Sequence, residues 1–350
     1  MSKTLKRGIY FICLLVAALC IADFIYVKFF FKEDVLEADA KLLFDLDSLQ
    51  QTCDVIYFAE SSNATYSPKD TCPNSISELI GRELPDIRMG TIQHGAYHAK
   101  LFLDLVKNIE EGSTVKTIIV TMNLRSFGAY WIHSWLETPL MKADVMYKKY
   151  PPICRRMMLA FGEFDNKTEK ERAPEVGWQW KHDKLNVHPG FKYQNTYDWD
   201  GQTGILEKYT LPDGTRDEKT IQVTCNYIKA LGFTIDTLTN PRIKDFDEIV
   251  KIAKEKKLNL VFNLMAENVQ HADSLVGDEL VYLMRQNRDL LMKRYNKQGV
   301  LVVDNLELVN GNNFIEFDVI SEHYDQVGRK AIAVHVAKVA GKYLTVHRSY

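Results

Sequence analysis

Four short apolar segments place the strongest constraint on the fold of this 350-residue chain. They are rich in β-branched residues and show no alternation between apolar and polar positions. Such strands are expected where helices cover both faces of a sheet, because neither row of side chains then meets water. The segments are "DVIYFA" at 54–59, "TIIVTMN" at 117–123, "NLVFNLM" at 259–265 and "GVLVVDN" at 299–305. They predict a mostly parallel sheet in an α/β domain.

Helix-like stretches fall between and after these strands. The predicted helices are Ser75–Glu83, Ala96–Glu110, Phe246–Lys256, Asp278–Tyr295 and Gln326–Tyr343. Strands that alternate with helices of this length predict a three-layer α/β/α sandwich. In such a sheet, functional side chains gather at the carboxyl ends of the strands.

The N-terminus carries a long apolar run, from 8 to 31, that follows three basic residues and is interrupted only by Asp23 and Lys28. A helix of this length can cross a bilayer, and its basic leading end is expected to stay cytoplasmic. A cleaved signal peptide is the alternative, since 8–22 alone has the length of its apolar core. We interpret 1–33 as a membrane anchor or signal segment. Both interpretations put the remaining chain outside the cytoplasm.

The remaining chain divides into a stem and a working domain. Apolar residues three or four apart predict a helical stem at 34–52, followed by an α/β domain at 53–350. An aromatic-rich insertion at about 128–240 interrupts the alternation and holds all five tryptophans. Its turn signals, such as "PDGT" at 212–215, predict short strands and hairpins. The tryptophans either form the insertion's own core or stack on sugar rings.

Composition excludes some classes of partner and leaves the disulfides open. A formal net charge of −2 and ordinary composition give no sign of nucleic-acid binding. The four cysteines outside the apolar run are too dispersed for a zinc signature, and no other ligand spacing predicts a metal or cofactor. A disulfide among them fits an exported domain, but the sequence does not select a pair.

Two polar segments hold candidate catalytic residues. In "YFAESSN", Ser61 follows a predicted strand directly, where small residues leave a hydroxyl reachable. In "NFIEFDVISEHYDQVGRKAIA", His323 lies in a polar loop just before a helix. Serines in such turns commonly act as caps. Ser62 is the alternative nucleophile if the block shifts by one residue, but a hydrogen-bonding role in the turn is favoured for it. A serine needs a histidine nearby to become a nucleophile.

Four blocks, taken together, resemble the SGNH (GDSL-like) hydrolase superfamily. The G-D-S block is represented by Ala59-Glu60-Ser61, the glycine block by "RMGTIQHGAYHA", the G-x-N block by "VTMNLRSF" and the D-x-x-H block by "FDVISEHYDQVGRKAIA". The likeness is greatest to the membrane-anchored branch near the teichoic-acid D-alanylation and alginate O-acetylation proteins. It covers 54–127 and 259 to the C-terminus, and it implies a flavodoxin-like α/β/α fold.

The resemblance also implies roles for individual residues. Ser61 would be the nucleophile and His323 the general base. The oxyanion would be held by the backbone N–H groups of Ser61 and Gly95 and by the side chain of Asn123. Each such donor contributes about 3 kcal/mol of transition-state stabilisation. Glu60, in place of the family's aspartate, would brace the loop or contact substrate.

The orienting acid is the main departure from the family pattern. Ile320 stands three residues before the histidine, where the family has an acid. The acid is therefore Asp318, Glu322 or absent, and Asp318 is favoured because adjacent side chains in an extended loop point apart. Asn268, after the third predicted strand, is expected either to contact substrate or to cap a helix.

These inferences predict a membrane-anchored extracytoplasmic serine esterase or O-acyltransferase. Its substrates would be acyl esters of a cell-envelope or exported polysaccharide, and the acyl group would pass through a covalent acyl-serine. Hydrolysis and transfer use the same residues, so both stay open. The alternative is a non-catalytic accessory protein of a polysaccharide-modification system. Its cleft would bind glycan or a membrane-embedded acyltransferase.

Overall fold

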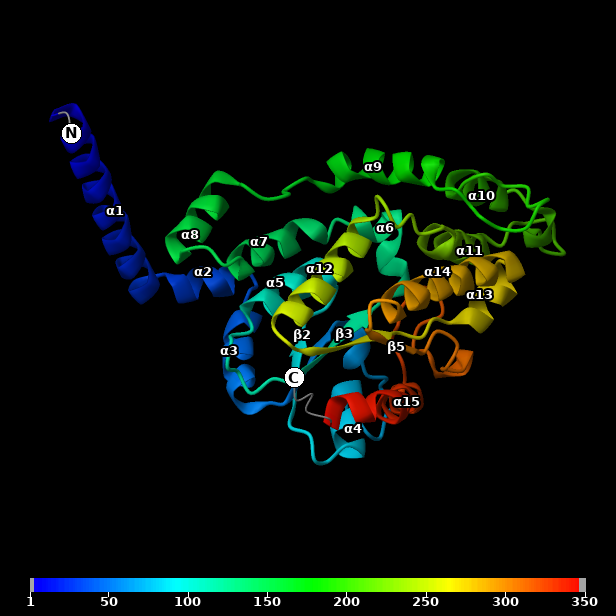
Figure 1. Cartoon of the computed structure of the whole chain (residues 1–350). Coiled ribbons are helices and arrows are strands. Elements are labelled where there is room, and N and C mark those ends of the chain that lie inside the picture. Colours follow the sequence, from blue (N-terminus) through cyan, green and yellow to red (C-terminus); the bar gives the residue numbers. More distant parts are fainter. Residues whose placement is uncertain (1–2, 346–350) are drawn as a thin grey trace.

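Five parallel strands form the sheet of the computed structural model, which describes residues 3–345 (Figure 1). Their order is β2-β1-β3-β4-β5, the flavodoxin-like order of doubly wound folds. The strands are β1 (Val55–Ala59), β2 (Met89–Gln93), β3 (Thr117–Met122), β4 (Asn259–Leu264) and β5 (Leu301–Asp304). The predicted parallel α/β sheet is confirmed. Residues 1–2 and 346–350, at the ends of the predicted anchor and domain, lie outside the described residues.

Helices cover both faces of this sheet. Figure 1 shows α4 and α15 on one side of the strands and α5 and α12 on the other. The helices before the insertion are α1 (Lys3–Phe29), α2 (Phe31–Glu37), α3 (Leu42–Thr52), α4 (Ile76–Glu83) and α5 (Ala99–Asn108). Those after it are α12 (Pro241–Glu255), α13 (Val269–Leu275), α14 (Asp278–Asn296) and α15 (Gln326–Thr345). Short 3-10 turns are η1 (Ser61–Asn63), η2 (Leu124–Phe127), η3 (Glu207–Tyr209) and η4 (Gly311–Asn313).

The central strand β1 shows why the two helical layers form. All five of its side chains are buried, and successive ones point to opposite faces. Ile56 and Phe58 join the core beneath α5 and α12, whereas Val55 and Tyr57 join the core beneath α4 and α15. A strand that is apolar on both faces therefore requires a helical layer on each side.

Strand β2 is the one strand that the sequence analysis did not predict. Only Gly90 and Ile92 are buried, so the segment lacks the continuous apolar run of a central strand. It lies at the edge of the sheet, where one face of a strand can stay polar. A Cβ atom on Gly90 would lie 2.8 Å from the Cys53 Sγ and 2.9 Å from Leu49, so α3 packs closely on this edge.

The predicted stem is two helices, and the second packs on the domain. Leu42, Leu43 and Leu46 of α3 belong to the main hydrophobic core. The side chain of Gln50 accepts a hydrogen bond of 2.8 Å from the backbone N–H of Glu110, and its carbonyl accepts one from Thr114. The helix is thus bonded to the segment that follows α5.

The aromatic insertion is helical, which contradicts the predicted hairpins. Its helices are α6 (Ala129–Ile132), α7 (Glu137–Tyr147), α8 (Pro152–Phe161), α9 (Glu169–His182), α10 (Thr196–Thr203) and α11 (Glu218–Leu231). Among the described residues here, the Thr210–Arg216 bridge is the one extended pairing. The prediction failed because turn residues also end helices: Gly162, for example, caps α8 with φ 66°.

The tryptophans of the insertion differ in burial. Trp199 is buried and stacks on Tyr193 with ring centroids 5.8 Å apart. Trp135 and Trp178 are exposed instead, and Trp131 lies under the guanidinium of Arg125 at 4.4 Å.

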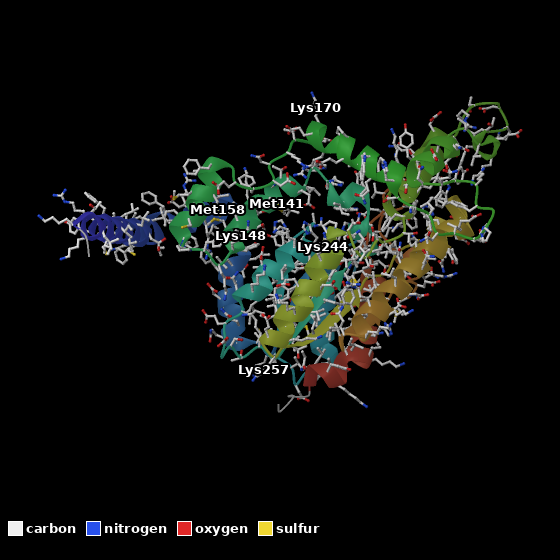
Figure 2. All side chains as sticks on the ribbon, turned by 45° about the horizontal axis from the view of Figure 1, so that its top comes forward. Met141, Lys148, Met158, Lys170, Lys244 and Lys257 are labelled. Atoms are coloured by element: carbon white, nitrogen blue, oxygen red, sulfur yellow. The ribbon has the colours of Figure 1, made fainter. Side chains whose placement is uncertain are left out.

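Helix α1 projects from the domain (Figure 1). It has 27 residues and a mean hydropathy of 2.5 over its most apolar window, so it is long and apolar enough to cross a membrane. Near its end, the Asp23 carboxylate accepts the backbone N–H of Ile153 at 2.7 Å, at the start of α8. Figure 2 shows Met158 of α8 near Met141 and Lys148, at the side of the domain from which α1 extends.

The packing of α3 predicts the outcome of two leucine substitutions. Leu46→Ala should lower the free energy of unfolding by about 3 kcal/mol, because Leu46 is fully buried and its loss leaves a cavity. Leu36→Ala, at a side chain that is 51% exposed, should change it by less than about 0.5 kcal/mol. Urea unfolding of the full chain in detergent measures both. Equal small effects would mean that α3 does not pack on the domain.

Candidate active site

The carboxyl ends of β1 and β3 bring two predicted site residues to one edge of the sheet. Ser61 follows β1 after a single residue, and Asn123 follows β3 directly. The two strands pair in register from Val55 opposite Thr117 to Phe58 opposite Val120. The strand order reverses between them, and ligands of doubly wound sheets bind at such a switch point.

Hydrogen bonds to neighbouring elements fix the serine loop. Glu60 caps η1, and its Oε1 accepts the backbone N–H of Ser62 at 3.2 Å. Asn63 is buried and donates to Gln93 at 2.6 Å and to Ser77 at 3.2 Å, which ties the loop to β2 and α4. The Ser61 carbonyl accepts the Thr65 hydroxyl at 2.8 Å. The serine is therefore held on a rigid turn.

Ser61 lies in a continuous chain of hydrogen bonds with a histidine and an acid. Its Oγ is 2.9 Å from Nε2 of His323. Nδ1 of the same ring is 2.9 Å and 3.1 Å from the two carboxylate oxygens of Glu316. The Ser321 hydroxyl also donates to Glu316. This is the geometry of a serine, a base and an orienting acid.

The acid beside His323 is Glu316, and the favoured Asp318 does not contact the ring. Asp318 is 66% exposed and pairs with Lys219 at 2.9 Å on the surface. The loop folds back on itself through an antiparallel bridge between Phe314 and Tyr324, and the Ile315 N–H donates to the His323 carbonyl. This pairing brings Glu316, seven residues earlier in the chain, next to the histidine.

Glu322, the second candidate acid, points away from the histidine and into the protein. It is fully buried, and both of its carboxylate oxygens accept hydrogen bonds from Arg125, whose Nε lies 2.5 Å from Oε1. Nη1 of Arg125 also donates to the Ile320 carbonyl at 2.7 Å. The ion pair thus joins the turn after β3 to the histidine loop.

Three glutamates and one arginine form a buried charge cluster behind Ser61. Its members are Glu60, Glu267, Glu322 and Arg125. Burial and the negative charge of Glu322 raise the pKa of Glu60, and the same causes hold that of Glu267 well above its usual range. Glu60 also lies 3.0 Å from the Ser61 Oγ through its Oε2. The sequence analysis expected Glu60 to brace the loop or contact substrate.

Arg329, on α15, connects the serine loop with the histidine loop. It is fully buried and donates to the carbonyls of Thr65 at 2.8 Å and Tyr324 at 2.5 Å. It also forms an ion pair of 2.7 Å with Asp70. Burial alone would raise the pKa of Asp70, but hydrogen bonds from Arg329 and from the Gln326 N–H lower it. One side chain therefore bonds directly to both loops.

A cavity of about 250 Å³ opens beside Ser61 and His323. Asn123 lines it, and among the described residues the buried Oδ1 of Asn123 has no hydrogen-bond partner. Gly95 is exposed and lies outside the lining, whereas Ala96, the next residue, lines the cavity with the strained φ of 63°. The further lining residues are Glu60, Tyr97, His98, Arg125, Ser126, Trp131, Ser134, Leu136, Glu137, Leu140, Arg242, Glu316, Val319, Ile320 and Ser321.

A compensated ion cluster forms another wall of this cavity. Nη2 of Arg242 lies 2.5 Å from the Glu137 carboxylate, and Nε2 of His98 lies 3.1 Å from it. Burial and the Arg242 charge lower the pKa of His98 to about 4, so the ring is neutral at pH 7. Although burial opposes ionisation, His98 and Arg242 lower the pKa of Glu137 to about 2.

Two other residues considered at the sequence level do not reach the cavity. Ser62 is fully buried, and it lies outside the lining. Asn268 caps α13 by accepting the His271 N–H at 3.1 Å and donates to the Gly311 carbonyl.

All six cysteines lie in the described part of the chain and are free. Within residues 3–345, no three His, Cys, Asp or Glu side chains gather as a metal site.

Comparisons with known proteins give low similarity. No family model matches the chain, and no curated protein matches it. Among solved structures, it is similar to LAE5, an alpha/beta hydrolase enzyme from the metagenome of Lake Arreo, Spain. That match has 9% identity and a TM-score of 0.39, and it covers 83% of this chain and 96% of the other. A lipase/acylhydrolase from Enterococcus faecalis has 7% identity and a TM-score of 0.35, with 84% and 98% covered.

The role of Arg329 predicts a large stability loss on substitution. Arg329→Met should lower the free energy of unfolding by about 3 to 5 kcal/mol, since it leaves Asp70 buried without its partner. Because the pKa of Asp70 is lowered, its stabilisation is present above about pH 4 and is lost as the pH falls further.

The matched control is Arg285→Met, which removes an exposed ion pair with Glu307 and should cost less than about 1 kcal/mol. Urea unfolding at pH 7 compares the two variants. Similar small losses in both would show that Arg329 does not hold the loops together.

Proposed function

We propose that this protein is a serine esterase or O-acyltransferase with Ser61 as its nucleophile. The observation that carries the proposal is the hydrogen-bonded chain from Ser61 through His323 to Glu316, which borders the 250 Å³ cavity. A reachable hydroxyl, a base within 2.9 Å and an acid on the other ring nitrogen meet the needs of acyl transfer. Glu316 takes the place that the sequence analysis gave to Asp318.

The first half of the reaction forms an acyl-serine. The Ser61 Oγ attacks the carbonyl carbon of the ester while Nε2 of His323 takes its proton. Glu316 accepts the Nδ1 proton in a hydrogen bond and stabilises the imidazolium that forms. The oxyanion receives hydrogen bonds from the Asn123 side chain and from the backbone N–H groups of Ser61 and Ala96. Ala96, which lines the cavity, replaces the Gly95 expected from the sequence. Nε2 then returns the proton to the leaving alcohol.

The second half releases the acyl group. Water, or a sugar hydroxyl that occupies the place of the first alcohol, gives its proton to Nε2 of His323 and attacks the acyl carbon. The C–O bond to Ser61 breaks and the serine regains its proton from the histidine. Water gives a free carboxylic acid, and a sugar hydroxyl gives a new ester. The same side chains serve both outcomes.

An aromatic surface beside the cavity supports a glycan as the substrate. A second cavity, of about 290 Å³, shares Arg125, Trp131 and Ile320 with the first, so the two are adjacent. Tyr130, Trp131, Trp135 and Trp180 line it. Flat aromatic side chains of this kind present apolar faces on which sugar rings stack. We therefore propose a cell-envelope or exported polysaccharide as the substrate.

Helix α1 supports a membrane location with the domain outside the cytoplasm. Its apolar length suffices for one span, and three basic residues, at 3, 6 and 7, lie at its start. Basic residues favour the cytoplasmic side, so the chain that follows α1 would be extracytoplasmic.

The mechanism predicts how two neighbouring acids respond to removal of their charge. In Glu316→Gln, labelling of Ser61 by a fluorophosphonate should slow about a hundredfold or more, because His323 loses its orienting carboxylate. In Asp318→Asn, the rate should stay within about twofold, since that side chain is exposed. The measurement is the labelling rate of the full chain in detergent, followed by peptide mass spectrometry.

Ser61→Ala is the control for site identity and should abolish labelling. The proposal of catalysis is wrong if the wild type takes no label and hydrolyses no aryl acetate. A non-catalytic accessory protein would behave in that way. Equal rates in Glu316→Gln and Asp318→Asn would instead reject Glu316 as the orienting acid.

The proposed topology predicts the accessibility of Cys72, which is exposed in the structure. A membrane-impermeant maleimide added to intact cells that express the full chain should modify the peptide containing Cys72. Cys72→Ser is the control and should lose that modified peptide. Modification that requires permeabilised cells would place the domain in the cytoplasm and contradict the topology.

A further inference from the structure

The Ser61 hydroxyl has two neighbours that compete for its single proton. Nε2 of His323 lies 2.9 Å from Oγ, and Oε2 of Glu60 lies 3.0 Å from it. A hydroxyl can donate one hydrogen bond and accept others. Both neighbours cannot receive the same proton, so one of them must itself be a donor.

The histidine is the neighbour that must receive the proton. Nδ1 of His323 faces the Glu316 carboxylate at 2.9 Å and 3.1 Å, so Nδ1 carries the hydrogen of the neutral ring. Nε2 is then a bare acceptor, as a general base requires. The Ser61 proton points at Nε2, and its oxygen offers only lone pairs to Glu60.

Glu60 must therefore supply the hydrogen between itself and Ser61. Its other oxygen, Oε1, already accepts the Ser62 N–H at 3.2 Å, which leaves Oε2 as the protonated atom. An ionised Glu60 would either repel the serine lone pairs or turn the hydroxyl away from the histidine. Its place beside the nucleophile is productive only with a proton bound.

The surroundings of Glu60 favour the protonated carboxyl. The side chain belongs to a residue that is 4% exposed, and the acids Glu322 and Glu267 belong to the same buried cluster. Arg125 is the cation in this cluster, and its guanidinium donates two hydrogen bonds to Glu322. The phenols of Tyr57 on β1 and Tyr324 on the histidine loop are further titratable groups that interact electrostatically with Glu60.

We propose that Glu60 is a positioning residue that acts in its protonated form, donating a hydrogen bond to Ser61 Oγ so that the serine proton is directed at His323. This inference rests on the proposed function, because it assigns a role beside the nucleophile of that reaction. Glu60 and Glu316 then flank the same serine and histidine in opposite states. In this proposal Glu60 must be neutral and Glu316 charged.

The proposal predicts a loss of activity on the alkaline side of the pH profile. Burial and Glu322 raise the pKa of Glu60. The proposal requires the Glu60 carboxyl to keep its proton at neutral pH and to lose it at higher pH. Ionised Glu60 then accepts the hydrogen bond of the Ser61 hydroxyl in place of His323, and the labelling rate falls.

Glu60→Gln distinguishes protonated from ionised Glu60, because the amide resembles the protonated carboxyl in shape and hydrogen bonding and cannot ionise. Its oxygen can accept the Ser62 N–H, and its NH₂ group can donate to Ser61 Oγ. At pH 7 this variant should react with a fluorophosphonate within about threefold of the wild-type rate, whereas Glu316→Gln should lose about a hundredfold. Glu60→Gln should also lack the alkaline decline, while Glu60→Asp should keep one.

The labelling rate of the full chain in detergent, measured from pH 5 to pH 10, tests this, with thermal melting as the check of folding. A folded Glu60→Gln variant that reacts about a hundredfold slower, or that keeps the wild-type alkaline decline, overturns the proposal. Failure of the wild type to react would instead overturn the proposed function itself.

A measurement on the wild type decides the matter if Glu60→Gln does not fold. The infrared spectrum should contain a protonated-carboxyl band that disappears with the same midpoint as the alkaline loss of labelling. A wild type that loses activity without any carboxyl band titrating at that midpoint contradicts the proposal. Ser61→Ala provides the background rate for every labelling measurement.

Discussion

The position of the candidate site depends on the buried guanidinium of Arg329. Ser61 and His323 lie 262 residues apart in the chain, on loops near the beginning and the end of the domain's sequence. Arg329 binds the carbonyls of Thr65 and Tyr324, one in each loop, and its charge is balanced by Asp70. A buried arginine without these partners would be strongly destabilising, so the two loops and the arginine must assemble together. The 2.9 Å contact between serine and histidine follows from that assembly.

The second constraint is the imbalance of charge behind the serine. Arg125 forms an ion pair with Glu322 and thereby joins the turn after β3 to the histidine loop. Trp131 lies under the same guanidinium. Glu60 and Glu267 remain beside this pair without a further cation in the cluster, and burial raises the pKa of both. The same arrangement thus orders the loops and favours the protonated form of the acid next to Ser61.

Much of the scaffold could be predicted from the sequence, because buried parallel strands carry a continuous apolar run. The edge strand β2 has no such run, and the helical insertion uses the same turn residues that a hairpin would. Ser61 and His323 could be located because each lies next to a strand end or a helix start, and Asn123 because its block resembles the family's G-x-N block. Glu316 could not, since its contact with His323 depends on the bridge between Phe314 and Tyr324 rather than on spacing. The strained backbone at Ala96, beside the predicted Gly95, likewise has no signal in the sequence.

A covalent acyl-serine is the central claim, and trapping it is the most direct test. The full chain would be mixed briefly with an aryl acetate, quenched in acid and digested for peptide mass spectrometry. The account predicts an acetyl group on Ser61 that decays when the quench is delayed after the substrate is consumed. An acetyl group on Ser62, or no acetylated serine while the ester is hydrolysed, would contradict it.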